Sequence, residues 1–318
     1  MMIAQIKLRI ESLPSLYVFT LFFIMVAFGC NPKLQSPPSP KEEIYVASDF
    51  TKEGLFTSGI EGPAYVDGNV YVVNFDTQGT IGIVDMQGNC SLFVDLPSGS
   101  IGNGIRVNDL GDLFVADYTM HNVLKIDRTT RNIEVFAHSD SMNQPNDLAI
   151  RSDGTLFASD PNWKESKGQI WRIDTDGSIH LLESNMGTTN GIEVSPNEQY
   201  LYVNESVQRK VWRYNLADDG SISEKKLIHE FTDFGMDGMR CDSEGNLFVT
   251  RHGKGTVAIL NPEGELINEV ILSGKKPSNI AFGSADGRTC YVTLQDRGCL
   301  EQFRAEHPGR SFHLRMRN

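Results

Sequence analysis

Residues 103–117 read NGIRVNDLGDLFVAD, and a phrase of this form occurs six times in the chain. Each phrase opens on a residue with a carboxylate or amide side chain, passes through a turn and ends in a hydrophobic run. Successive openings are 42, 43, 44, 47 and 42 residues apart, so the chain is built from repeats of one supersecondary unit. The other five phrases are EGPAYVDGNVYVVN (61–74), NDLAIRSDGTLFASD (146–160), NGIEVSPNEQYLYVN (190–204), DGMRCDSEGNLFVTR (237–251) and NIAFGSADGRTCYVT (279–293).

Each repeat predicts four strands. Alternating apolar residues such as Ile105 and Val107 share one face of the first strand. A pair such as Asp67-Gly68 supplies the positive-φ positions of a tight hairpin turn. The second strand is a continuous hydrophobic run such as LFVA, which is typical of a strand buried on both faces. A third strand (NVLKID, QIWRID) and a more polar fourth (IEVFA, IHLLE) complete the unit.

Four strands in a repeat of about 43 residues, without a convincing helix, predict an all-β fold, a six-bladed β-propeller of four-stranded blades. Six blades fit between residues 59 and 307, but the sixth lacks a fourth strand. We expect the early strand Ile44–Phe50 (IYVASDF) to fill that place and close the ring, because an open sheet edge is a liability. A two-sheet sandwich is the competing fold, but it would not explain why the phrase recurs six times at a regular spacing.

Composition limits the partners of the protein. The 318 residues are 40% hydrophobic and 22% charged and include 29 glycines, as expected of a globular, turn-rich chain. A net charge of -12 argues against a nucleic-acid partner, which would require a basic patch. Common signatures such as G-x-x-x-x-G-K, G-x-S-x-G, C-x-x-C and H-E-x-x-H do not occur.

The N-terminus reads as a targeting segment. Lys7 and Arg9 precede an uncharged run of 14 residues, Leu16–Gly29, which is short for a membrane span of about 20 residues. Small residues before Cys30 resemble a bacterial lipoprotein signal, with cleavage before Cys30 and lipidation of its thiol. An ordinary secretory signal and an uncleaved anchor are the alternatives. All three deliver the domain outside the cytoplasm, to the cell envelope or periplasm. In the lipoprotein interpretation the protein contacts the membrane only through its N-terminal lipid anchor.

The predicted layout is therefore a signal segment (1–30), a Pro-rich linker (31–43), the propeller (44–307) and a basic, solvated C-terminal tail (308–318). Four cysteines remain in the exported part. Each lies in or beside a different predicted strand, so we expect mostly unpaired core thiols. They are Cys90, Cys241, Cys290 and Cys299.

Two concentric polar rings are expected at one mouth of the propeller, because the first strand of each blade lines the central channel and the second returns to the same end. The first ring consists of the residues that open the phrases: Glu61, Asn103, Asn146, Asn190, Asp237 and Asn279. The second ring consists of Asn74, Asp117 with Tyr118, Asp160, Asn204 with Glu205, Arg251 with His252, and Gln295.

A single Asn or Asp at the start of a strand is most simply a turn-stabilising residue. Six copies in phase, one of them replaced by glutamate, favour a site instead. Converging carboxylates repel one another unless a cation neutralises them, and an all-oxygen shell favours Ca²⁺ over Zn²⁺. The pattern predicts a divalent metal, most simply Ca²⁺, with Mg²⁺, Mn²⁺ and Zn²⁺ as alternatives.

Three further residues are weighed individually. His252 is placed as a substrate contact or proton carrier, or as a simple rim residue. Trp163 falls in a loop above the mouth, where it could form a lid. Trp171 and Trp212 belong to third strands, so we expect them to pack between blades.

The phrases EGPAY, QPNDLAIRSDG, TTNGIEVSPNEQYLYVNES, MDGMRCDSEGNLFVT and NIAFGSADGRTCYVT resemble the senescence-marker-protein/gluconolactonase family, also called regucalcin-like. The resemblance runs from about Glu61 to Phe303 and covers all six blades. It implies a six-bladed propeller that binds a divalent metal, usually calcium, at the channel mouth. It also implies a hydrolase of sugar lactones, although relatives hydrolyse other lactones or organophosphates.

The resemblance maps metal ligation onto Glu61, Asn190 and Asp237, with Asn146 completing the shell or contacting substrate. It implies opening of a lactone ring in which the metal polarises the carbonyl and Asp237, as general base, activates water. The residues expected to contact the small-molecule substrate are Asn103, Asp117, Asp160, Arg251 and His252.

The sequence departs from the family at two positions near the site. Tyr65 stands where members often have tryptophan, and Gln144 replaces an arginine-like contact, so the identity of the substrate stays open. Two other functions remain: a metal-stabilised binding propeller without turnover, and a phosphotriesterase-like hydrolase acting at the same site.

Overall fold

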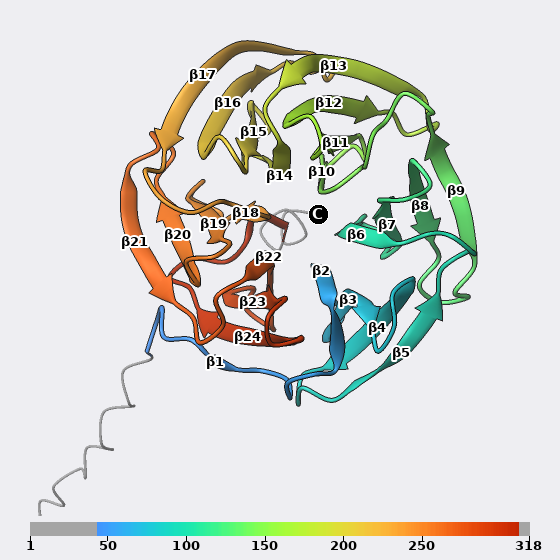
Figure 1. Cartoon of the computed structure of the whole chain (residues 1–318), viewed down its shortest axis with the longest axis vertical. Helices are drawn as coiled ribbons and strands as arrows, with labels where there is room; N and C mark the ends of the chain where they lie inside the picture. Colours follow the sequence, from blue (N-terminus) through green and yellow to red (C-terminus); the bar gives the residue numbers. More distant parts are fainter. Residues whose placement is uncertain (1–42, 312–318) are drawn as a thin grey trace, which may run out of the picture. The chain divides into compact units, whose positions relative to one another are not determined.

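The computed structural model describes residues 43–311, which form 24 strands in six four-stranded antiparallel sheets. Figure 1 shows the sheets arranged as blades around a central axis, with the first strand of each phrase innermost. The predicted all-β, six-bladed propeller is confirmed. The predicted signal segment (1–30) and nearly all of the linker (31–43) lie outside the described residues. Within residues 43–311, no helix is long and apolar enough to cross a membrane.

Five blades are made of four consecutive strands each, which follow one another from the innermost strand outward. The first three are β2 (Phe56–Val66), β3 (Asn69–Phe75), β4 (Thr80–Asp85) and β5 (Cys90–Asp95); β6 (Gly102–Val107), β7 (Leu113–Asp117), β8 (Asn122–Ile126) and β9 (Ile133–His138); β10 (Leu148–Ile150), β11 (Leu156–Asn162), β12 (Lys167–Ile173) and β13 (Ile179–Met186). The next two are β14 (Thr189–Val194), β15 (Tyr200–Glu205), β16 (Lys210–Leu216) and β17 (Ile222–Glu230); β18 (Met239–Cys241), β19 (Leu247–Arg251), β20 (Thr256–Leu260) and β21 (Leu266–Ile271).

The sixth blade closes the ring with both ends of the propeller sequence. It contains β22 (Pro277–Gly283), β23 (Thr289–Leu294), β24 (Cys299–Arg304) and, outermost, β1 (Ser48–Asp49). Ser48 pairs with Gln302, and the Tyr45 amide donates to the carbonyl oxygen of Arg304 at 2.8 Å. The expected closing strand is therefore present, although its regular part is two residues rather than the predicted seven (44–50).

The hydrophobic core is divided among the interfaces between neighbouring blades. Val73 of the first blade packs in one cluster with Ile105 of the second. Phe114 of the second blade packs with Leu148 and Trp171 of the third, which confirms that Trp171 is a packing residue between blades. Both faces of the inner strands are thus buried, so each innermost strand is held firmly beside the channel.

Two smaller expectations have different outcomes. The four cysteines within residues 43–311 are unpaired, as predicted. The expectation of a solvated C-terminal tail is wrong for its first residues, because Arg310 is only 4% exposed. Its Nε donates to the carbonyl oxygen of Ser195 at 3.1 Å, and its Nη2 donates to Glu198 Oε1 at 2.6 Å. The chain thus continues past the last blade into the channel region.

Candidate functional site

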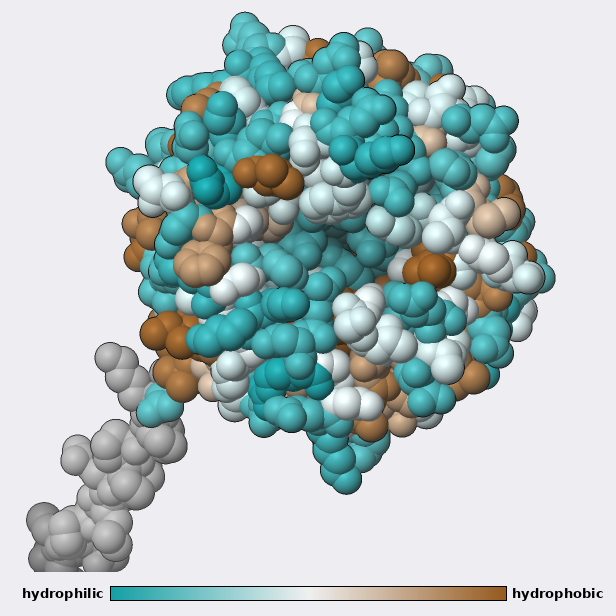
Figure 2. All heavy atoms as spheres, viewed as in Figure 1, coloured by the Kyte–Doolittle hydropathy of each residue, from teal (hydrophilic) through white to brown (hydrophobic). Residues whose placement is uncertain are grey.

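The residues that open the six phrases come together at one end of the channel. Four of them lie within innermost strands, whereas Asn146 and Asp237 each lie two residues before one. Every member except Asn279 lines a cavity of about 260 Å³. Figure 2 shows the centre of one face hollowed and lined by hydrophilic side chains. The remaining residues that line the cavity are Gly59, Asn74, Gln78, Ile101, Tyr118, Trp163 and Gln295.

Glycine follows the opening residue in four phrases because the innermost strands approach one another closely there. A Cβ on Gly191 would lie 2.6 Å from the carbonyl oxygen of Asp237, and one on Gly238 would lie 2.1 Å from Cγ of Asn279. A Cβ does not approach a non-bonded heavy atom this closely, so glycine is required at both positions. The close approach draws the opening residues of successive blades into one small ring.

Glu61 is held in place by two donors and leaves one oxygen free. It is 3% exposed, and its Oε2 accepts hydrogen bonds from the Gly62 amide and from Asn279 Nδ2, the latter at 2.9 Å. The side chain of Asn279 therefore positions Glu61, a role that its place at the start of a strand did not reveal. Glu61 Oε1 is buried without a hydrogen-bond partner.

Three amide oxygens share this condition: Asn204 Oδ1, whose residue does not line the cavity, and two from residues that do. The latter two are Asn146 Oδ1 and Asn190 Oδ1, which have no hydrogen-bond partner and belong to residues that are at least 95% buried. Buried polar atoms are rarely left unpaired in folded proteins, so three such oxygens at the cavity, these two and Glu61 Oε1, indicate a missing partner.

Both carboxyl groups of the site are held in surroundings that disfavour their ionised form. Burial, followed by the nearby charge of Asp147, raises the pKa of Glu61 to about 7. Burial and then the charge of Glu61 raise the pKa of Asp237 well above its usual range. Two buried carboxylates this close are stable together only if a proton or a cation neutralises them.

The donor set fits a divalent cation of the hard type. Glu61 Oε1, Asn146 Oδ1, Asn190 Oδ1 and the Asp237 carboxylate are all oxygen donors, which suits Ca²⁺ or Mg²⁺. Residues 43–311 contain no group of three or more His, Cys, Asp or Glu side chains that could hold a metal. A cation bound here therefore depends on the amide oxygens as well as the two carboxylates.

Asp117 and Asp160, expected to contact substrate, do not reach the cavity. Both are fully buried. Asp117 accepts hydrogen bonds from Ser100 Oγ at 2.7 Å and from Asn122 Nδ2 at 3.0 Å. Asp160 accepts from Trp171 Nε1 at 2.9 Å and from two backbone amides of the loop before its blade. Both carboxylates therefore hold loops against the blades, and the predicted substrate contact stays a prediction.

Arg251 likewise serves a neighbouring loop. It is 1% exposed, lies 3.5 Å from the centre of the Phe231 ring, and its Nη2 donates to Asp233 Oδ1 at 2.8 Å. His252 is half-buried, and burial lowers the pKa of its ring below the usual value. Its Nε2 lies 3.1 Å from Oε1 of Gln295, which lines the cavity. Of the expected substrate contacts, only Asn103 lines the cavity itself.

Three residues that line the cavity were not anticipated: Gly59, Gln78 and Ile101. Gln78 lies in the turn after β3, and Ile101 directly precedes β6. Both fall outside the repeated phrases, so the sequence period assigns them no place. The topology of the blades could have placed Gln78 at the site, because the turns that follow the second strands lie at the same mouth of the channel.

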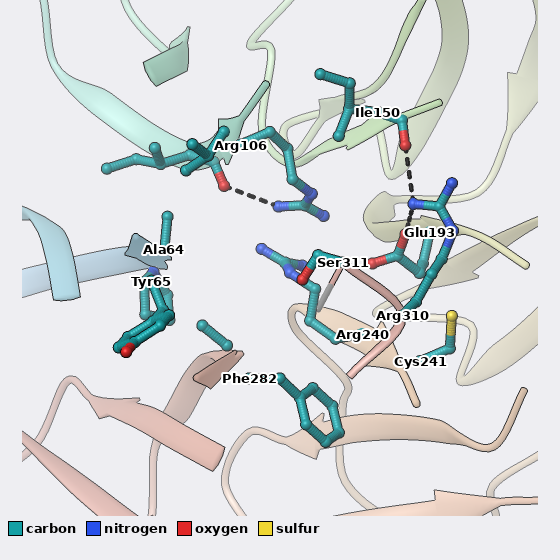
Figure 3. A pocket seen from close by; sticks show the side chains of 14 residues that line it. Ala64, Tyr65, Arg106, Ile150, Glu193, Arg240, Cys241, Phe282, Arg310 and Ser311 are labelled. Atoms are coloured by element: carbon teal, nitrogen blue, oxygen red, sulfur yellow. Dashed lines mark hydrogen bonds and ion pairs between the residues drawn. The ribbon is translucent and has the colours of Figure 1, made fainter. Parts of the chain in front are cut away.

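The other end of the channel is closed by charged side chains (Figure 3). Asp147, fully buried, bridges Arg106 Nη1 at 3.1 Å and Arg240 Nη1 at 3.0 Å. Beyond them, Arg310 and Glu193 border a cavity of about 60 Å³ among the C-terminal ends of the innermost strands. These charges largely pair with one another, so they stabilise the closed end of the channel. We therefore place the candidate site at the open mouth.

The architecture and the ring define a six-bladed propeller with a buried, oxygen-lined site at one mouth of its channel. The chain belongs to the family described as SMP-30/Gluconolactonase/LRE-like region, whose model matches residues 60–296. It is 30% identical over 216 residues to a gluconolactonase of Zymomonas mobilis, an alignment that covers 60% of each chain. It is also 27% identical to the diisopropyl-fluorophosphatase of Loligo vulgaris, over 82% of this chain and 93% of that one.

Solved structures share the fold. A calcium-binding protein from Agrobacterium tumefaciens, regucalcin, superposes with a TM-score of 0.71 at 19% identity, covering 83% of this chain and 97% of that one. At that identity the likeness establishes the architecture alone.

Proposed function

We propose that the protein is a metal-dependent lactonase that opens the ring of a small-molecule lactone. The observation that carries the proposal is the group of buried oxygens without partners beside the Asp237 carboxyl, at the mouth of the channel. The gluconolactonase of Zymomonas mobilis supports a lactone as the substrate class.

The residues that would hold the metal are Glu61, Asn146, Asn190 and Asp237. A divalent cation at these oxygens supplies Lewis-acid polarisation of the lactone carbonyl. The all-oxygen donor set favours calcium. Asn279 and the Gly62 amide fix the orientation of Glu61, so the donor geometry is set before any ligand binds.

Asp237 is the group that accepts a proton. Its carboxyl borders the cavity together with Asn190. It takes the proton from the attacking water and returns it to the ring oxygen as the carbon–oxygen bond breaks, which yields the hydroxy acid. Tyr118, Gln78 and Trp163 border the same cavity and would orient the lactone.

The test is a panel of lactones assayed with purified protein after chelation and after add-back of Ca²⁺, Mg²⁺, Mn²⁺ or Zn²⁺. We expect chelation to abolish hydrolysis and Ca²⁺ to restore it. Asp237→Asn should lose at least a hundredfold in kcat, whereas Asp140→Asn, at a side chain 98% exposed, should keep full activity. Chelator-sensitive stability without hydrolysis of any lactone would identify a binding propeller instead.

Phosphotriester hydrolysis is the second candidate, favoured by the alignment with the diisopropyl-fluorophosphatase of Loligo vulgaris over 93% of that enzyme. A phosphoryl oxygen could take the place of the lactone carbonyl, with Asp237 as base. Turnover of an organophosphate that exceeds that of every lactone in the panel would select this function.

We also propose that the chain is exported and lipid-anchored through Cys30. Its support is the sequence pattern of residues 1–30 alone. Labelling of cells with a fatty acid, for wild type and for Cys30→Ser, tests this proposal. The variant should lose the label, and equal labelling of both proteins would contradict the anchor.

A further inference from the structure

Four exposed apolar side chains lie on loops at the same mouth as the cavity. We call Met120, Trp163, Val207 and Phe234 the apolar arc; they are 44, 38, 55 and 51% exposed. The first three lie in the turns between the second and third strands of the second, third and fourth blades. Phe234 lies in the loop from β17 to β18. Single exposed apolar residues are common, but four on successive loops around one opening form a surface.

These loops contact one another. Gln208 Nε2 donates to the carbonyl oxygen of Ser166 at 3.3 Å, which joins the turn that carries Val207 to the turn that carries Trp163. A Cβ on Gly235 would lie 3.5 Å from the carbonyl oxygen of Ser206, so the loop that carries Phe234 lies beside the turn of the fourth blade. The loops that carry three members of the arc are therefore neighbours.

Trp163 belongs to the apolar arc and also lines the cavity, so the two adjoin at this residue. The opposite side of the mouth is polar. Gln78 of the first blade and Gln295 of the sixth, neighbours in the ring, line the cavity there, and His252 lies 3.1 Å from Gln295. The mouth thus has two chemically different sides, with the candidate metal ligands below them.

We propose that the apolar arc binds an alkyl or aryl substituent of the lactone, so that the preferred substrates are apolar-substituted lactones rather than fully hydroxylated sugar lactones. This inference rests on the lactonase function proposed above. A ring whose carbonyl reaches the metal ligands would leave its substituent at the mouth, where burial against the arc removes apolar surface from water. Sugar hydroxyls placed on the same surface would lose hydrogen bonds to water without replacement.

The experiment is a chain-length series of γ-lactones, from γ-butyrolactone through γ-hexalactone and γ-octalactone to γ-decalactone, compared with gluconolactone in saturating Ca²⁺. We expect kcat/KM to rise about two- to fourfold for each methylene until the arc is covered. The gain should appear mainly as a lower KM, because the substituent binds equally in the ground and transition states.

A double variant, Val207→Ser with Phe234→Ser, tests the surface directly. Both side chains are more than half exposed, so the fold should tolerate the change. We expect the rise in kcat/KM with chain length to flatten, with the ratio of γ-decalactone to γ-butyrolactone falling at least fivefold. Leu110→Ser is the matched control: Leu110 is 85% exposed but lies in the turn between β6 and β7, at the other end of the channel.

The outcomes are distinguishable. A flat series, or preference for gluconolactone, overturns this inference and leaves the lactonase function intact. Hydrolysis of none of the lactones overturns both. If the double variant changes the sedimentation coefficient but not the chain-length dependence, the arc is a contact between copies of the chain and the inference is wrong.

Discussion

Replacing Glu61 by glutamine tests whether the site is built around a charge that only a cation can neutralise. In metal-free protein, burial raises the pKa of Glu61 from its ordinary value of 4.5 to about 7. The native state therefore binds more protons than the unfolded state between these two values. Because stability falls with pH wherever the native state holds the extra proton, the contribution of Glu61 is lost as pH rises through this window.

The magnitude follows from the size of the shift. A difference of about 2.5 pKa units corresponds to about 3 kcal/mol between the two protonation states. For a domain of this size, that amounts to roughly 6 to 12 °C in Tm. Glutamine at position 61 cannot ionise, so the variant should lack this slope. It also removes the charge that raises the pKa of Asp237, which should flatten the curve further.

The assay is thermal unfolding in chelator between pH 4.5 and 8, repeated in saturating Ca²⁺. Metal-free wild type should lose stability across this range, and Glu61→Gln should lose much less. With calcium bound, both carboxylates are favoured in their ionised form, so wild-type stability should instead rise with pH. Glu263→Gln, at an exposed position, is the control and should follow wild type.

Parallel curves for wild type and Glu61→Gln in chelator would refute the reasoning. They would mean that Glu61 titrates alike in the folded and unfolded chain. An absence of calcium-dependent stabilisation in wild type would separately contradict the assignment of the unpaired oxygens to a metal.

Three further changes test other parts of the structure. Arg310→Ala should destabilise the fold by about 3 kcal/mol in urea, because it removes a buried ion pair, while leaving kcat unchanged. An equal loss for Arg209→Ala, at an exposed side chain, would contradict this. Asp160→Asn should cost about 2 kcal/mol of stability with KM for the lactone unchanged, since its oxygens bond a loop; a selective rise in KM would restore it as a substrate contact. Asn190→Ala should weaken Ca²⁺ binding at least tenfold by calorimetry, and an unchanged Kd would remove Asn190 from the metal shell.

The ring of opening residues was predictable because two independent signals coincide there. The sequence period places each opening residue at the same radius and height in its blade. The glycine that follows most of them marks where backbones meet, as the short contacts at Gly191 and Gly238 show. The carboxylate or amide oxygen that each opening residue carries then distinguishes these positions from ordinary strand starts.

The second ring was predicted only in part. Asn74, Tyr118 and Gln295 line the cavity as expected, but the sequence period alone does not tell what satisfies a buried oxygen such as those of Asp160. Asp160 and Asn190 both fall at polar positions of a repeat, yet Asp160 accepts hydrogen bonds from the loop before its blade and Asn190 Oδ1 accepts none. The partners of Asp160 lie at residues 143 and 144, outside the repeated phrase. Loops between blades vary in length and sequence, so a periodic pattern carries no information about them.

Departures from the repeat, rather than the repeat itself, create the charge at the site. Six asparagines in a ring would bring no net charge to a cation, and the carboxylates come from Glu61 in the first blade and Asp237 in the fifth. Where other phrases have glycine, the third has Asp147, whose charge is met by two arginines at 3.1 and 3.0 Å. Burial instead raises the pKa values of both Glu61 and Asp237, and the charge of Glu61 raises that of Asp237 further. The channel therefore contains one carboxylate neutralised by arginines of the protein and two carboxyl groups at the mouth that take up a proton or, in our proposal, a cation; this difference favours cation binding at the mouth over binding deeper in the channel.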